Sequence, residues 1–117
     1  MPNPVVHFEI QGKDPKKLHR FYSQLFGWHV NADNPMEYGL VDTHTEGGIG
    51  GGIGGTNGGP NRVTFYVQVD DLAAYLKKAE RLGAKILVPP TEIPNMVTFA
   101  LFADPEGNAI GLVKEMA

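Results

Sequence analysis

Two short runs of β-branched and aromatic residues carry the side chains that could do chemistry. His7 and Glu9 lie two positions apart in the first run, and Thr64, Tyr66 and Gln68 have the same spacing in the second. Residues two apart in a strand share a face, so each run should present its polar side chains together. An imidazole titrates near neutral pH, and His7 beside Glu9 could therefore act as a general base. A hydrogen-bonded structural role for His7 is the alternative, and both interpretations stay open.

The composition disfavours several other kinds of chemistry. The chain has 117 residues and no cysteine, which excludes disulfides, thiolate metal sites and a cysteine nucleophile. Ser23 is the only serine in the sequence and has no base beside it, so a serine hydrolase is not supported. The formal net charge is −3 and the lysines and arginines are scattered, whereas nucleic acid requires clustered positive charge.

The sequence also shows no targeting or membrane segment. No apolar stretch approaches the roughly 18 residues that a membrane span needs. The N-terminal residues lack the basic and apolar regions of a signal peptide. We therefore expect a cytoplasmic protein that binds neither nucleic acid nor membranes.

Residues 47–60 hold nine of the 15 glycines of the chain. Gly50, Gly52 and Gly55 satisfy the G-x-G-x-x-G pattern of dinucleotide-binding loops, but that pattern needs a helix directly after it. Turn residues and then a new strand follow instead. We interpret the segment as a glycine-rich strand with a connector, in which the glycines allow the close approach of backbone or ligand.

The first half of the chain has the pattern of a strand, a helix and further strands. Asp14 is a suitable N-cap, Pro15 a suitable first helical residue, and Gly27 can end the helix in the left-handed conformation. The helix has an apolar stripe at Leu18, Phe21, Tyr22 and Leu25. The expected strands are residues 5–10, 28–32 and 37–41. His19 should be solvated, and Trp28 and Tyr38 should be core or pocket wall.

The same order recurs in the second half. Asp70 or Asp71 caps the expected second helix, and Gly83 ends it. Its apolar stripe is Leu72, Tyr75, Leu76, Ala79 and Leu82. The expected strands are residues 63–69, 85–88, 97–102 and 109–113. Turn residues 104–108 should join the last two strands as a hairpin.

These patterns predict one α+β domain over residues 1–117, formed by two βαβββ modules. The modules cover about residues 4–56 and 62–115, with the glycine-rich connector at about residues 47–60. One helix followed by several strands favours helices on one face of a curved sheet. Alternation places two apolar sets toward the helices: Val6, Phe8 and Ile10 in the first module, and Phe65, Val67 and Val69 in the second. The opposite, polar faces should then converge on a cleft suited to a small molecule, although a solvated sheet surface is the alternative.

Three sequence motifs resemble those of the vicinal oxygen chelate superfamily. This superfamily groups glyoxalase I, bleomycin-resistance proteins and extradiol dioxygenases. The motifs are Phe21-Tyr22-x-x-Leu25-Phe26-Gly27-Trp28 at the end of the first helix, Val67-x-Val69-Asp70-Asp71 before the second, and Asp104-Pro105-x-Gly107-Asn108 before the last strand. The resemblance covers nearly the whole chain. It implies a curved, incomplete barrel-like sheet with helices on the outside, and in the enzymes of the superfamily a divalent metal.

The resemblance implies metal ligands at defined positions. These are a His or Gln on the first strand of each module and a Glu on the last strand of a module. His7 matches, whereas Thr64 and Gly111 stand at the other two positions. Because an open divalent site needs about three protein ligands, we expect no family metal and no other cofactor. A rearranged site that uses Glu9 or Glu46 stays open.

Three functional classes follow. The first is a metal-free protein of the bleomycin-resistance kind, which binds a small molecule through His7, Glu9, Thr64, Tyr66 and Gln68. The second is a glyoxalase-type lyase or isomerase, or a ring-cleavage dioxygenase, with a rearranged metal site or with His7 as its acid–base group. The third is an interaction module without chemistry. The replaced ligands favour the first class, and the resemblance also implies a homodimer.

Overall fold

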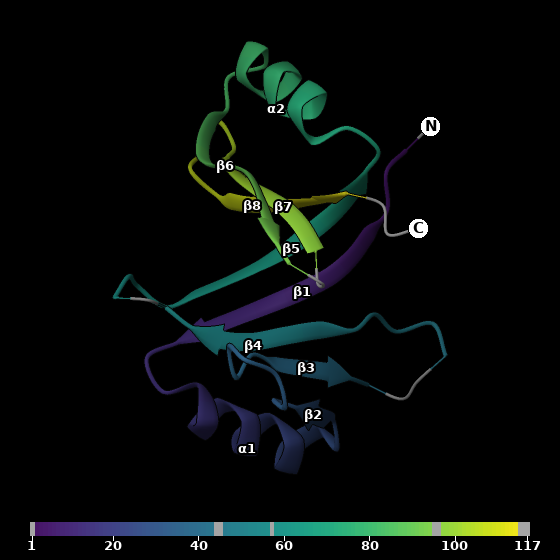
Figure 1. Cartoon of the computed structure of the whole chain (residues 1–117), viewed down its shortest axis with the longest axis vertical. Coiled ribbons are helices and arrows are strands. Elements are labelled where there is room, and N and C mark those ends of the chain that lie inside the picture. Colours follow the sequence, from purple (N-terminus) through teal and green to yellow (C-terminus); the bar gives the residue numbers. More distant parts are fainter. Residues whose placement is uncertain (1, 44–45, 57, 95–96, 115–117) are drawn as a thin grey trace. The chain divides into compact units, whose positions relative to one another are not determined.

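The computed structural model describes residues 2–43, 46–56, 58–94 and 97–114. Its contacts divide the chain into two compact units. The first unit is His7–Thr64, and the second is Phe65–Ala117 together with Met1–Val6. Each unit is described by itself below, and Figure 1 labels the elements of both. No helix among the described residues is long and apolar enough to cross a membrane.

The first unit holds one helix packed on one face of a sheet (Figure 1). Its elements are β1 (Val5–Gly12), α1 (Pro15–Phe26), β2 (His29–Asn31), β3 (Gly39–Asp42) and β4 (Gly51–Gly55). The strands lie in the order β2-β3-β4-β1. β4 runs parallel to β1, with Glu9 beside Gly52, whereas β3 is antiparallel to both β2 and β4.

The second unit repeats this plan. Its elements are β5 (Arg62–Val69), α2 (Leu72–Arg81), β6 (Lys85–Ile93), β7 (Val97–Ala103) and β8 (Ala109–Lys114). The strands lie in the order β5-β8-β7-β6, and β8 runs parallel to β5 with Tyr66 beside Gly111. The core of this unit is Val69, Leu72, Leu76, Ala100 and Leu112. The predicted βαβββ repeat is confirmed, and so is the hairpin of β7 and β8.

The helix ends follow the predicted chemistry. The Asp14 carboxylate accepts the backbone N–H of Lys17 at the start of α1, and Gly27 ends this helix with φ +72°. Asp71, rather than Asp70, caps α2, because its carboxylate accepts the backbone N–H of Ala74. Each cap satisfies a backbone donor that the first helical turn leaves without a partner.

The apolar stripe of α1 is less covered than predicted. Phe21 is 53% exposed and Leu25 57% exposed, and no residue of this helix is fully buried. α2, by contrast, buries Leu72 and Leu76.

The glycine-rich segment forms strand β4, as predicted, and the next element is another strand, β5. The helix that a dinucleotide loop requires is therefore replaced by a strand. The other predicted strands have bounds that shift by one or two residues, except β6, which extends further. β3 begins at Gly39 rather than at residue 37, and β6 continues through two prolines to Ile93, with irregularities in its pairing to β7.

Candidate functional site

A chain of hydrogen bonds links the two polar residues of β1 through a residue that precedes β3. The hydroxyl of Tyr38 donates to Oε2 of Glu9 at 2.8 Å and lies 3.1 Å from Nε2 of His7. The rings of His7 and Tyr38 are stacked, with centroids 6.4 Å apart. Glu9 is only 9% exposed, and His7 and Tyr38 are half-buried.

The direction of these hydrogen bonds fixes the proton positions. A phenol carries one proton, and Tyr38 gives it to Glu9, so its oxygen accepts from Nε2 of His7. Burial lowers the pKa of His7 because it disfavours the charged imidazolium. In this arrangement the neutral ring donates to Tyr38 as its Nε2–H tautomer.

Tyr38 fits between its partners because β4 presents glycines beneath its ring. A Cβ built at Gly52 would overlap the phenol oxygen and ring carbons of Tyr38. A Cβ built at Gly54 would lie 2.9 Å from a ring carbon of the same side chain. Real side-chain atoms do not approach so closely, so neither position accepts a larger residue without moving Tyr38.

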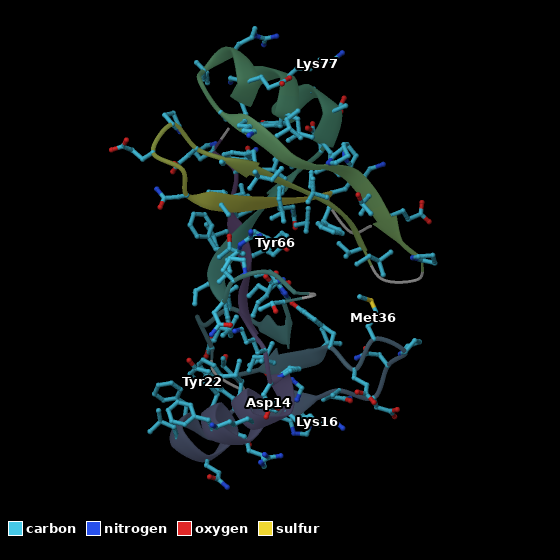
Figure 2. The ribbon with its side chains drawn as sticks, turned by 90° about the vertical axis from the view of Figure 1, so that its left-hand side faces the viewer. Asp14, Lys16, Tyr22, Met36, Tyr66 and Lys77 are labelled. Carbon is cyan, nitrogen blue, oxygen red and sulfur yellow. The ribbon has the colours of Figure 1, made fainter. Side chains whose placement is uncertain are left out.

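The backbone of Tyr38 is held as firmly as its ring. The side-chain amide of Asn34 donates to the Tyr38 carbonyl at 2.7 Å and accepts the Tyr38 N–H at 3.0 Å. Glu37, directly before it, has φ +51° and is the one described non-glycine residue with positive φ. Such conformations persist where the surrounding structure imposes them. In Figure 2, Met36 projects from this loop, where it is 59% exposed.

The opposite face of β1 packs against aromatic side chains. Phe8 contacts Trp28, which also stacks on Tyr22 of α1 with centroids 5.5 Å apart. This aromatic cluster confirms the apolar face predicted for β1, and Figure 2 shows Tyr22 among the side chains of α1. The prediction that His19 is solvated was wrong. Its Nε2 lies 3.0 Å from the carbonyl oxygen of the buried Ile53. The imidazole has room there because Gly39 has no side chain.

The three site residues predicted on β5 lie in different surroundings. Thr64, in the first unit, is buried. Tyr66, in the second unit, is 6% exposed, and its ring covers Gly111 so closely that a Cβ there would overlap it. Gln68 is half-buried and its backbone N–H donates to the Pro4 carbonyl at 2.9 Å. Their part in ligand binding stays a prediction.

The register of the parallel strands makes Gly52 and Gly111 equivalent. Gly52 pairs with Glu9 in the first unit, and Gly111 pairs with Tyr66 in the second. In each unit a tyrosine ring fills the space beside the glycine. The last strand of each unit therefore carries a tyrosine-covered glycine at the equivalent register position.

The resemblance implies a divalent metal, and the described residues His7 and Glu9 have other contacts. Among the described residues, no three or more His, Asp or Glu side chains are grouped to hold an ion. His7 and Glu9 meet at the Tyr38 hydroxyl instead, and Glu46 is exposed. A divalent site with an open position needs about three such ligands.

The role of Tyr38 was missed by sequence reasoning, which expected only core or pocket wall there. Its hydroxyl reaches β1 across β4, and this depends on a strand pairing that the local pattern does not show. The available signal was the spacing of Gly52 and Gly54, which leaves one face of β4 without side chains.

Known proteins are similar to this chain in sequence and in fold. A family model described as the Glyoxalase/Bleomycin resistance protein/Dioxygenase superfamily matches residues 5–112. A glyoxylase-like domain-containing protein of Didymella fabae is 30% identical over 112 residues, covering 89% of this chain and 88% of its own. The glyoxylase CFP32 of Mycobacterium tuberculosis is 29% identical over 113 residues, covering 89% of this chain. The present chain spans only 42% of the length of CFP32.

Solved structures support the same assignment of fold. A hypothetical protein of Bacillus halodurans C-125 has a TM-score of 0.75 at 11% identity, covering 100% of this chain and 97% of its own. Methylmalonyl-CoA epimerase of Mycobacterium tuberculosis has a TM-score of 0.68 at 14% identity, covering 97% of this chain and 88% of its own. These likenesses confirm the predicted α+β fold. With the family match over most of its length, the chain belongs to the Glyoxalase/Bleomycin resistance protein/Dioxygenase superfamily.

Proposed function

We propose that this protein binds a small molecule on the polar face of β1 without a divalent metal. The observation that carries the proposal is the chain from His7 through Tyr38 to Glu9, which holds three polar groups in fixed positions. A few fixed polar groups are what a small-molecule site uses to orient its ligand. Gly111, which stands where the resemblance implies a glutamate ligand, supports a metal-free site.

Several finer expectations belong to the same proposal. Thr64, Tyr66 and Gln68 are further candidate ligand contacts, and a cytoplasmic location is expected from the sequence. We also propose that the protein pairs with a second copy of itself. Apolar side chains on α1 support this pairing, because Phe21, Leu25 and Phe26 are each more than half exposed.

A thermal-shift screen tests the binding function. The full chain, purified without chelator, is screened against divalent metals and neutral metabolites, and its metal content is measured. A bound metabolite should raise Tm, since a ligand at 100 times its Kd stabilises the folded state by about 2.7 kcal/mol. His7→Asn and Glu9→Gln should reduce the shift, whereas Gln24→Ala, on the exposed side of α1, should not. A stoichiometric metal, or a shift produced by metals alone, would contradict the proposal.

A further inference from the structure

We propose that Tyr38 is the specificity-determining residue of the site, because its ring occupies a slot that would otherwise accept a planar ring with a hydroxyl group. Gly52 and Gly54 are the positioning residues that form the floor of this slot. The inference rests on the proposed binding function and deepens it, since it says which ligands the native site excludes. These are ligands that must place a phenol-like ring over β4.

The floor of the slot is a part of β4 without side chains. In the pairing of β4 with β1, Gly52 lies opposite Glu9, on the polar face. Gly54 lies opposite Gln11, two positions further along. Residues that pair across neighbouring strands project to the same side of a sheet. Ile53, between the two glycines, points to the other side and is fully buried. The glycines therefore leave a strip of bare backbone beside the polar residues of β1.

The Tyr38 ring lies over this strip and meets a hydrogen-bond acceptor at its far end. A Cβ at Gly54 would lie 2.9 Å from one ring carbon, and a Cβ at Gly52 would overlap the hydroxyl oxygen. The hydroxyl donates to Oε2 of Glu9 at 2.8 Å. The ring of His7 is nearly parallel to the phenol, at an interplanar angle of 18°. The occupied slot thus has a flat floor, an aromatic neighbour and an acceptor at one end.

These three features select a planar ring that carries a hydroxyl group. The floor admits only a flat group, since a single methyl group at position 52 would already overlap the hydroxyl. The carboxylate of Glu9, which is 9% exposed, favours a hydrogen-bond donor at the end of the slot. Tyr38 supplies both the flat ring and the donor. A ligand of the native protein must therefore bind beside Tyr38 rather than over the glycines.

The slot should remain when Tyr38 is shortened. Tyr38 precedes β3, whereas the floor is held by the pairing of β4 with β1 and β3. Tyr38 is half-buried, so the space that its ring leaves would be accessible from solvent. Cavities left by truncated side chains in other proteins bind small aromatic molecules. Tyr38→Ala should therefore create a binding site for phenol.

Phenol and benzene are the probes that test the slot in the full-length chain. They differ only in the hydroxyl group, which would donate to Glu9 as the Tyr38 hydroxyl does. Calorimetric titration should show that phenol binds Tyr38→Ala at least about tenfold more tightly than benzene does, because a hydrogen bond to a charged group contributes that much or more. The native chain should bind neither probe at the same concentrations.

Substitutions on β4 test the floor. In Tyr38→Ala, a further Gly52→Ala places a methyl group where the phenol oxygen would lie, so phenol binding should be lost. A further Gly55→Ala adds the same methyl group to β4 and should leave phenol binding unchanged, because a Cβ there meets nothing within 4 Å.

Urea unfolding measures the same contact without a probe. Gly52→Ala should lower the unfolding midpoint of the native chain, and it should do so much less in Tyr38→Ala and in Tyr38→Leu, which lack the ring atoms over Gly52. Residues in contact show such coupling, whereas independent positions add. Gly55→Ala should have the same effect in all three backgrounds.

The outcomes separate this inference from the proposed function. Phenol that binds the native chain as tightly as Tyr38→Ala, or that binds this variant no better than benzene, would overturn the role of Tyr38. An equal effect of Gly52→Ala in all backgrounds would overturn the role of Gly52. Tyr38→Leu keeps an apolar side chain, so the unfolding comparison decides even where Tyr38→Ala fails to fold. A screen in which no metabolite binds the native chain would contradict the proposed function, whereas the probe and unfolding results would still report on the slot.

Discussion

At the scale of single residues, the sequence predicted two of the three side chains that the hydrogen-bond chain links. Strand alternation placed His7 and Glu9 on one face, and the structure joins them. The joining atom, the Tyr38 hydroxyl, was not predictable because it comes from 29 positions beyond Glu9. It arrives there through the pairing of β3 with β4 and the turn that Asn34 stabilises. Local patterns do not encode such a long-range contact.

Removing the Tyr38 hydroxyl should destabilise the protein. Glu9 is buried and accepts this hydroxyl, and loss of a hydrogen bond to a buried charged group costs about 1.5–3 kcal/mol. Urea unfolding of Tyr38→Phe should show a loss of that size. Tyr75→Phe is the matched control, because the Tyr75 hydroxyl lies 3.4 Å from Oδ1 of Asn3 and so makes a weak contact. Equal losses in the two variants would contradict the view that Glu9 depends on Tyr38.

Folding stability should also fall in mild acid because of His7. Burial lowers the folded-state pKa of His7 below its ordinary value of 6.5, whereas the unfolded chain keeps that value. As pH falls below 6.5, the unfolded state therefore binds more protons, and the free energy of unfolding decreases until pH passes the folded-state pKa. In His7→Gln this component should disappear.

The measurement is urea unfolding at a series of pH values between 7.5 and about 4.5, a range that brackets the usual histidine titration. His29→Gln is the control, since His29 is exposed on β2. A His7→Gln profile that matches the native one would show that His7 is not responsible.

At the scale of helices and strands, the sequence-based predictions were most accurate for features that neighbouring residues determine. The N-caps and the left-handed Gly27 depend on neighbouring residues alone, and the structure confirms them. The exposure of α1 and the extension of β6 depend instead on what lies beside each element. β7, for example, pairs with β6 as far as Ile93 despite the two prolines. Propensity alone does not predict either outcome.

The two adjacent aspartates before α2 provide a test at this scale. Asp71 accepts the Ala74 N–H at 3.1 Å, and replacing such an N-cap with alanine costs about 1 kcal/mol. Asp71→Ala should therefore lower the free energy of unfolding by about that amount. Asp70→Ala should change it by less than about 0.5 kcal/mol, as exposed substitutions usually do. Chemical unfolding of both variants decides between them, and a larger loss in Asp70→Ala would reverse the assignment of the cap.

At the scale of the whole molecule, the two units bury their helices unequally. α2 contributes Leu72 and Leu76 to a defined core, whereas α1 leaves large apolar side chains in contact with water. Exposed apolar clusters of this kind often mark surfaces that bind another protein.

Substitution of Leu25 should therefore separate the proposed dimer. Leu25 is 57% exposed on α1, next to the exposed Phe21 and Phe26, and a buried carboxylate at this position would have no compensating charge among these apolar neighbours. Sedimentation velocity should find the native chain as a dimer and Leu25→Glu as a folded monomer. Leu82→Glu, at the 71% exposed end of α2, introduces the same charge outside this surface and should remain dimeric. A native chain that sediments as a monomer at all concentrations would refute the pairing, and a monomeric Leu82→Glu would place the interface on α2 instead.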